Sequence, residues 1–283
     1  MKKFYIFILC FCFIVTLSSP LRAAEETPAV MPTGDITLDV LSMYYYNGQE
    51  CSRNSVVIQP SVTVGYYGFS VSMWGNLDTG AYSTPAAQTS RAAWNETDFV
   101  LSYSRTIGLF NLSGSYAYYG YSPYYVGDVR IADQQEIYVS VGLNTLLAPK
   151  LTIYKYIDDG RRWYFKMGVS HSFEFNKYIG LKLEGTVGYL LGQDKDFWTE
   201  SKFDDNAVKM NETYNGLLDG VATVSIPLKP PIKNVTITPK VSYAVPITAD
   251  ARNYMKGMGM AANTPADRQS TYLFGGISFN YSF

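Results

Sequence analysis

This chain has little charge, little histidine and little cysteine. Of its 283 residues only 17% are charged, and it contains one His and three Cys. An average soluble domain is about a quarter charged. Because 23 Lys+Arg balance 24 Asp+Glu, a basic nucleic-acid-binding protein is excluded. The sequence has no CxxC pair, no His cluster and no phosphate-binding loop, so we predict neither an enzyme nor a cofactor.

Long hydrophobic runs are also missing. After the first 20 or so residues, no apolar run approaches the roughly 18 residues that a membrane-spanning helix needs. Disorder is excluded in turn, because 47% of the residues are hydrophobic and 16% are aromatic. The unusually abundant residues are Tyr (25) and Gly (23). This composition favours a protein with many strands and an aromatic surface.

The N-terminus has the pattern of a secretory signal peptide. Two lysines, Lys2 and Lys3, precede an apolar run from Phe4 to Leu17, and small residues follow as far as Ala24. We expect residues 1–24 to be removed, residues 25–33 to form a short periplasmic segment, and residues 34–283 to fold. The alternative is a retained membrane helix. Without residues 1–24, Cys51 is the only cysteine, so no internal disulfide can form.

A period of two runs through the rest of the chain. At the C-terminus, Leu273, Gly275, Ile277, Phe279, Tyr281 and Phe283 alternate with small or polar residues. Such alternation predicts a strand with one apolar and one polar face. Twelve segments share the pattern: 34–46, 54–66, 68–77, 94–106, 109–121, 134–146, 149–157, 162–175, 177–191, 214–227, 232–245 and 271–283.

The connections between these segments alternate in length. Tight turns such as Tyr67-Gly68 and Asn176-Lys177 alternate with longer polar loops such as 78–93, 122–133, 192–213 and 246–270. Short turns at one end, longer loops at the other and an even strand count are typical of a bacterial outer-membrane barrel. Closure also removes edges, whose unpaired groups cost several kcal/mol each in lipid. The fold class predicted is an all-β, transmembrane, antiparallel up-and-down barrel of about 12 strands in the outer membrane, with both termini in the periplasm. A soluble β-sandwich is the alternative.

Aromatic residues near the strand ends predict two girdles at the membrane interfaces. The candidates with lipid-facing parity are Tyr44, Tyr46, Tyr66, Tyr103, Tyr116, Tyr118, Tyr189 and Tyr243. The aromatic C-terminus, Tyr281 and Phe283, resembles the terminal signal that such barrels present to their assembly machinery. We therefore expect the barrel assembly machinery, periplasmic chaperones, outer-membrane lipid and lipopolysaccharide to be partners.

The N-terminal half resembles the TorF-type family of outer-membrane porins. The similarity lies in Leu41–Gly48, followed by Val57–Val62, in Phe69–Asn76 with its Trp-Gly pair, and in Trp94–Asp98. The Arg that the family usually carries between Tyr45 and Gly48 is missing, because Tyr46 and Asn47 stand there. The resemblance implies an outer-membrane pore and says little about its substrate.

If the apolar parity faces lipid, the strand charges line the lumen. The first six segments contribute only acids: Asp39, Asp78, Glu96, Asp98 and Glu136. Segments seven to eleven contribute Lys155, Lys166, Lys182 and Lys240, together with Glu174, Glu184 and Asp219. Lys155 is placed inside because a lysine facing lipid at mid-bilayer costs about 2–4 kcal/mol. Opposed acidic and basic walls of this kind set selectivity in pores.

These features predict a porin-like channel for passive diffusion of small hydrophilic solutes. In a narrow lumen the same charges would instead pair and plug the barrel. A second alternative is a lipid hydrolase, because the single histidine, His171, has lipid-facing parity; no serine with matching parity lies on the neighbouring strands. A third is a structural or receptor barrel that acts through its surface loops.

Overall fold

The computed structural model describes residues 31–80, 92–122, 125–126, 129–130, 132–158, 160–194, 213–259 and 265–283. Residues Pro32–Phe283 form one compact unit. The expected signal peptide and most of the expected segment 25–33 lie outside the described residues.

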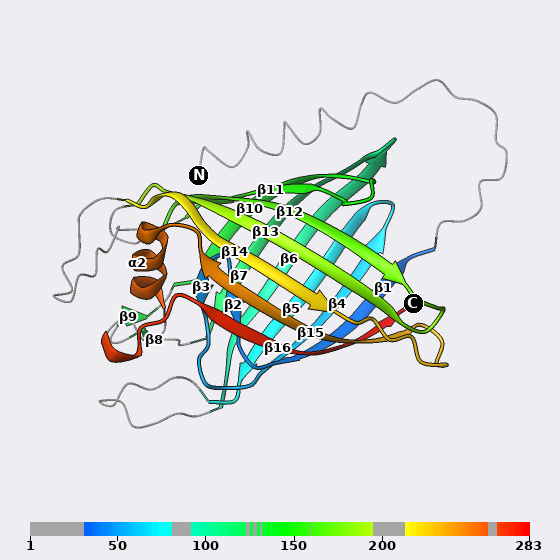
Figure 1. The fold of residues 1–283 in the computed structure, drawn as a ribbon. Coiled ribbons are helices and arrows are strands. Elements are labelled where there is room, and N and C mark those ends of the chain that lie inside the picture. The colour runs from blue at the N-terminus through cyan, green and yellow to red at the C-terminus, as the bar shows by residue number, and fades with distance from the viewer. Residues whose placement is uncertain are drawn as a thin grey trace, which may run out of the picture. The chain divides into compact units, whose positions relative to one another are not determined.

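Twelve strands close into an antiparallel barrel, which confirms the predicted fold class (Figure 1). The strands are β1 (Thr33–Leu41), β4 (Val57–Tyr66), β5 (Phe69–Asp78), β6 (Ala93–Ile107), β7 (Phe110–Tyr121), β10 (Gln134–Leu143), β11 (Lys150–Tyr156), β12 (Arg162–Glu174), β13 (Gly180–Gly192), β14 (Asn215–Ser225), β15 (Val235–Pro246) and β16 (Tyr272–Ser282). The first strand closes the ring by pairing with both β4 and β16, so the sheet has no free edge.

The barrel has two unlike ends. At the turn end lie the start of β1, the C-terminus and short connections such as Tyr67-Gly68, whose positive φ angles (51° and 83°) suit a tight hairpin (Figure 1). The other end, here the loop end, carries the longer connections. A short two-stranded sheet there joins β8 (Tyr125–Val126) and β9 (Val129–Arg130).

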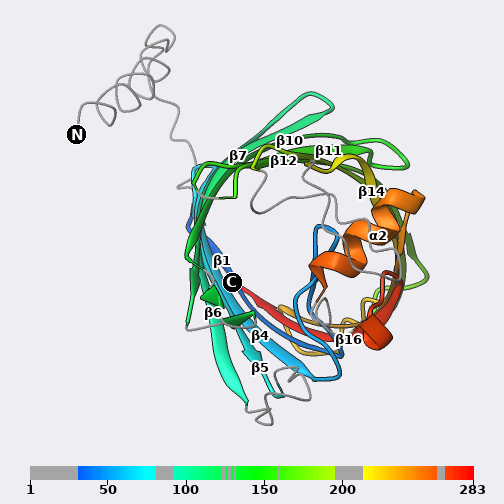
Figure 2. The same ribbon diagram turned by 90° about the vertical axis from the view of Figure 1, so that its left-hand side faces the viewer.

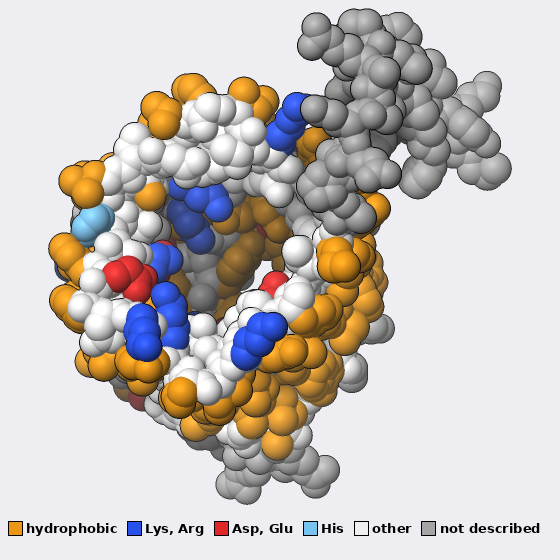
Figure 3. Space-filling view, turned by 90° about the vertical axis from the view of Figure 1, so that its right-hand side faces the viewer, with side chains coloured by type: hydrophobic (Ala, Val, Ile, Leu, Met, Phe, Trp, Pro, Cys, Tyr) orange, Lys and Arg blue, Asp and Glu red, His pale blue; other side chains and the backbone are white. Residues whose placement is uncertain are grey.

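The outer wall is apolar and exposed. Residues of one parity, such as Val71, Leu101 and Met167, leave 57%, 52% and 62% of their surface uncovered. Hydrophobic side chains surround the barrel when it is viewed from the turn end (Figure 3). Serines and threonines of the opposite parity pair across strands, as in Ser113–Ser140 and Thr223–Ser242. The period of two in the sequence is therefore a division between outer and inner faces.

The connection between β1 and β4 folds into the barrel. Residues 42–56, here the inward segment, include the short strands β2 (Tyr45–Tyr46) and β3 (Gln49–Glu50), which reverse at Asn47-Gly48 with φ of 46° and 83°. Figure 2 shows this blue segment inside the ring of strands. The prediction that Tyr44 and Tyr46 face lipid is wrong, because β1 ends at Leu41 and both residues belong to the inward segment.

A helix, α2 (Ala249–Met258), lies between β15 and β16 at the loop end (Figures 1 and 2). Thr248 caps it by accepting a hydrogen bond from the Ala251 N–H. A 3-10 turn, η1 (Pro265–Asp267), follows. Within the part of the chain that is described, no helix is long and apolar enough to cross a membrane.

Candidate functional site

The loop-end half of the lumen is filled on one side. The inward segment and α2 pack against β12–β16, and a buried apolar cluster joins them: Met43, Tyr164, Leu190, Tyr214, Leu218, Ala244, Ala251, Tyr254, Met255 and Tyr272. Arg53 ties the segment down further through its ion pair with Glu50 and a hydrogen bond to the Asp267 carbonyl. The free cross-section of the lumen is therefore narrowed at this level.

Three consecutive tyrosines of the inward segment reach three different wall strands. The Tyr44 hydroxyl donates to Glu96 on β6 (3.4 Å) and the Tyr46 hydroxyl to Glu136 on β10 (3.2 Å). The Tyr45 hydroxyl donates to Asp219 on β14 (2.9 Å). Each carboxylate is at least nine-tenths buried. These bonds hold the segment across the lumen.

Each of these carboxylates has a second phenol partner, which for Glu96 is Tyr121. Tyr119 donates to Glu136 (2.6 Å), and Tyr164 donates to Asp219 (2.6 Å). Gly188 leaves the space for the second contact, because a Cβ there would lie 2.0 Å from the Tyr164 hydroxyl. The result is a belt of tyrosines and acids at the constriction.

Lys166 lies on the turn-end side of this belt. Its ammonium is 5.5–6.0 Å from the ring centres of Tyr46, Tyr154 and Tyr164, which is cation–π distance. The carboxylates of Glu136 and Asp219 act on it electrostatically. The Lys166 ammonium is therefore held beside the constriction by three aromatic rings and two carboxylates.

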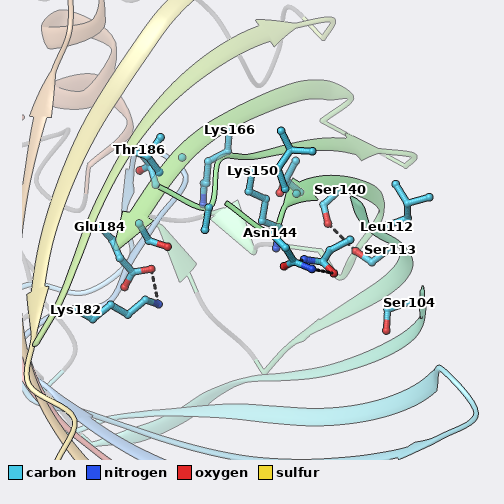
Figure 4. Close-up of a pocket in the computed structure, with 18 of the residues that line it drawn as sticks. Ser104, Leu112, Ser113, Ser140, Asn144, Lys150, Lys166, Lys182, Glu184 and Thr186 are labelled. Carbon is cyan, nitrogen blue, oxygen red and sulfur yellow. Dashed lines mark hydrogen bonds and ion pairs between the residues drawn. The ribbon is translucent and has the colours of Figure 1, made fainter. Parts of the chain in front are cut away.

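Below the constriction, toward the turn end, the wall opens into a cavity of about 520 Å³ (Figure 4). Its lining is polar, with Ser113, Ser140 and Asn144 on one side and Lys150, Lys166 and Thr186 on the other. Figure 3 shows that Lys and Arg side chains predominate around the turn-end opening. The cavity is therefore a predominantly basic vestibule.

Most of the predicted lumen charges do lie inside, but their pairing differs from two opposed walls. Asp39 meets Lys240 at 3.3 Å, because β1 and β15 flank the same strand, β16. Lys182 meets Glu184 at 2.8 Å on β13 (Figure 4). Glu174 meets Lys229 at 3.4 Å near the turn end. These acids are thus neutralised locally.

The charges on the inner face also separate along the barrel axis. The buried acids Asp78, Glu96, Asp98 and Glu136 sit at the loop-end parts of β5, β6 and β10. Lys150 and Lys182 sit near the turns that precede β11 and β13. A solute would therefore meet acids at one level and lysines at another.

The prediction that Lys155 lines the lumen is wrong. On β11 the residues that line the lumen cavity are Lys150, Thr152 and Tyr154, so Lys155 has outer parity. Its ammonium lies 4.9 Å above the Trp163 ring and contacts Gln193, beyond the end of β13. The free-energy cost of a lysine that faces lipid at mid-bilayer does not apply to Lys155, because its long side chain reaches the rim from the end of the strand.

His171 and the C-terminal aromatic residues lie apart from the lumen. His171 is on the outer face and shares a hydrogen bond with the Leu146 carbonyl (2.7 Å) beside the β10–β11 turn. Tyr281 and Phe283 stack on each other (6.2 Å between centroids) with half of their surface exposed. Cys51 is a free thiol in the inward segment. Among the described residues, no three His, Cys, Asp or Glu side chains form a metal-binding group.

Sequence reasoning missed the lumen tyrosines and the inward segment. Tyr119, Tyr154 and Tyr164 lie on the inner face, where the alternation by itself assigns them no role. A signal was present in Tyr44-Tyr45-Tyr46, which breaks the period of two just before an Asn-Gly turn. Thr248 followed by Asp250 likewise signals the start of a helix in what was expected to be a plain loop.

No known family's sequence profile and no curated protein matches this chain. Solved structures do match. The NanC porin is 9% identical, with 88% of this chain and 98% of that chain covered and a TM-score of 0.52. The KdgM porin is 12% identical (89% and 99% covered, TM-score 0.47). The COG4313 outer membrane channel from Pseudomonas putida F1 is 8% identical (94% and 100% covered, TM-score 0.48). At 9% identity the likeness to the NanC porin shows the fold alone, which is a closed β-barrel.

Proposed function

We propose that this protein is an outer-membrane channel through which small hydrophilic solutes diffuse passively. The observation that carries the proposal is the polar lumen cavity of about 520 Å³ inside a closed barrel whose outer face is exposed and apolar. An exposed apolar surface of this extent fits hydrocarbon rather than water. The start of β1 and the C-terminus, which lie at the turn end (Figure 1), face the periplasm in this proposal.

The lumen charges set the selectivity of this channel. Lys150, Lys166 and Lys182 line the vestibule, whereas Lys155 faces outward. The wider set expected from the sequence still includes Asp39, Asp78, Glu96, Asp98, Glu136, Glu184, Asp219 and Lys240, all with inner parity. Because several of the acids are paired or hydrogen-bonded, the vestibule lysines dominate the field that a solute meets.

Two features support the proposed membrane partners. The exposed tyrosines Tyr66, Tyr103, Tyr116, Tyr189 and Tyr243 fit interfacial girdles against lipid and lipopolysaccharide. The exposed pair Tyr281 and Phe283 is available to the barrel assembly machinery and its chaperones.

The test is ion selectivity in planar bilayers. We expect discrete conductance steps from the purified protein, and a shift of the reversal potential toward cation selectivity in Lys166→Glu/Lys182→Glu. Lys155→Glu is the control: it makes one such Lys-to-Glu reversal on the outer face and leaves the reversal potential unchanged. Absence of steps above background refutes the channel, and an equal shift in both variants refutes the role of the vestibule.

A further inference from the structure

One pair of lumen acids combines burial, close spacing and the absence of an ion pair among the described residues. Glu96 and Asp98 lie two residues apart on β6 with the same inner parity, and they are only 5% and 7% exposed. They are close enough to interact electrostatically. Asp39 and Glu184 each have a lysine partner, and Glu136 lies in the field of Arg162 and Lys166. No Lys or Arg among the described residues forms an ion pair with Glu96 or Asp98.

The partners of this pair are neutral and too few. Glu96 accepts hydrogen bonds from the phenols of Tyr44 and Tyr121. Asp98 lies against the same phenols, yet its Oδ1 is buried with no hydrogen-bond partner in the described structure. A buried carboxylate without a partner is strongly unfavourable, and two side by side are more so.

The neighbouring side-chain amides do not supply the hydrogen bond that the Asp98 Oδ1 lacks. Gln59 donates its side-chain N–H to Asn76 (2.9 Å), and Asn76 donates to Asn95 (2.7 Å). Asn76 is the residue that faces Glu96 across the β5–β6 pair. Because these amides donate to one another, they do not supply a hydrogen bond to the Asp98 Oδ1, which keeps its lone pairs for another ligand.

We propose that Glu96 and Asp98 bind a divalent cation, Ca²⁺, inside the lumen. Two carboxylates supply the charge that one divalent ion neutralises, and the unpartnered Asp98 oxygen supplies a free ligand. Ca²⁺ fits better than Mg²⁺, because it accepts six to eight oxygen ligands, water included, in flexible geometry, whereas Mg²⁺ demands a near-ideal octahedron. Oxygen donors also disfavour softer transition metals. Through the bond from Tyr44 to Glu96, the ion stabilises the inward segment in its observed place.

Terbium luminescence of the full-length protein in detergent micelles tests this site. Tyr44 and Tyr121 lie beside it and serve as antennae for bound Tb³⁺. We expect emission on tyrosine excitation that Ca²⁺ displaces, and Glu96→Gln/Asp98→Asn to weaken this Ca²⁺-sensitive binding at least about tenfold, since even the loss of supporting groups costs metal sites 10–100-fold. Asp39→Asn/Glu184→Gln is the matched control: it removes two lumen carboxylates that already have lysine partners and leaves the emission unchanged.

A second measurement needs no variant. Ca²⁺ raises the thermal midpoint of the wild-type barrel above that in NaCl of equal ionic strength, because a ligand of the folded state stabilises it. No rise in midpoint, or emission equal in both double variants, overturns the proposal and leaves a proton shared by the two acids as their neutralisation. Neither readout requires conduction, so failure of the cation site is distinguishable from failure of the proposed channel.

Discussion

The carboxylates at the constriction are held by phenols, whereas Asp39, Glu174 and Glu184 pair with lysines. Asp219 is 3% exposed and accepts one hydrogen bond from Tyr45 and one from Tyr164. A phenol donates a hydrogen bond without adding charge, and its ring covers the carboxylate from water. Such pairs allow acids to remain at the constriction while the lysines face the vestibule.

The Tyr164 hydroxyl should therefore contribute more to the free energy of unfolding than an ordinary surface hydroxyl does. We expect Tyr164→Phe to lower the free energy of unfolding by about 1–3 kcal/mol, because it leaves a buried acceptor short of a donor. Urea unfolding in micelles measures this. Tyr116→Phe is the control: its hydroxyl donates to Gln135 on the exposed outer face, so the loss stays within about 0.5 kcal/mol. Equal losses would contradict the role of the buried bond.

Among the elements, the inward segment decides how wide the lumen is. Its hairpin turns at Gly48, whose φ of 83° suits glycine and whose Cα faces Leu218 of β14. The Tyr44–Tyr46 bonds then fasten it to β6, β10 and β14. The constriction is thus a property of one connection and its three contacts, not of the strand number.

Displacing this turn should widen the channel. A Cβ at Gly48 would lie 2.4 Å from the Leu218 Cδ2, so Gly48→Ala is expected to push the hairpin from the wall and raise the single-channel conductance. Gly108→Ala is the control: it has a positive φ of 59° as well, but nothing lies within 4 Å of its Cβ position in the β6–β7 turn. The segment does not constrict the pore if Gly48→Ala leaves the conductance unchanged.

For the whole molecule, closure between the first and last strands is the determining contact. β1 and β16 pair from Asp35↔Ser282 to Leu41↔Gly276, and the Asn280 amide donates to the Thr37 hydroxyl inside the lumen (2.8 Å). Closure satisfies the backbone groups that an open sheet would present to hydrocarbon.

A disulfide across this seam tests the register. In a Cys51→Ser chain without residues 1–24, Thr37→Cys/Asn280→Cys should form an internal disulfide, since directly opposed residues lie about 4.5–5.5 Å apart. Non-reducing gel mobility after unfolding reports the large closed loop. Thr37→Cys/Tyr281→Cys, shifted by one residue, places the thiols on opposite faces and should not crosslink. Crosslinking in the shifted pair alone would mean that the register is wrong.

The alternation of side chains determined most of the fold. Because period two assigns each residue to the outer or inner face, the twelve predicted segments match the twelve barrel strands, with differences mainly at their ends. The inner parity of Lys166, Lys182 and Asp219 followed for the same reason. The local pattern suffices because successive side chains of a strand point to opposite faces, so the strand's own residues show which face meets lipid and which meets the lumen.

Long-range packing decided the rest. The period of two did not predict the positions of three side chains. Lys155 extends to the rim of the barrel, and Tyr44 and Tyr46 belong to the inward segment in the lumen. The partners of Asp39 and Asp219 come from residues 201 and 174 positions away. The sequence by itself determined the barrel, the faces and the charge inventory. Only the tertiary structure decided which charges meet, because closure brings together strands that are far apart in the chain.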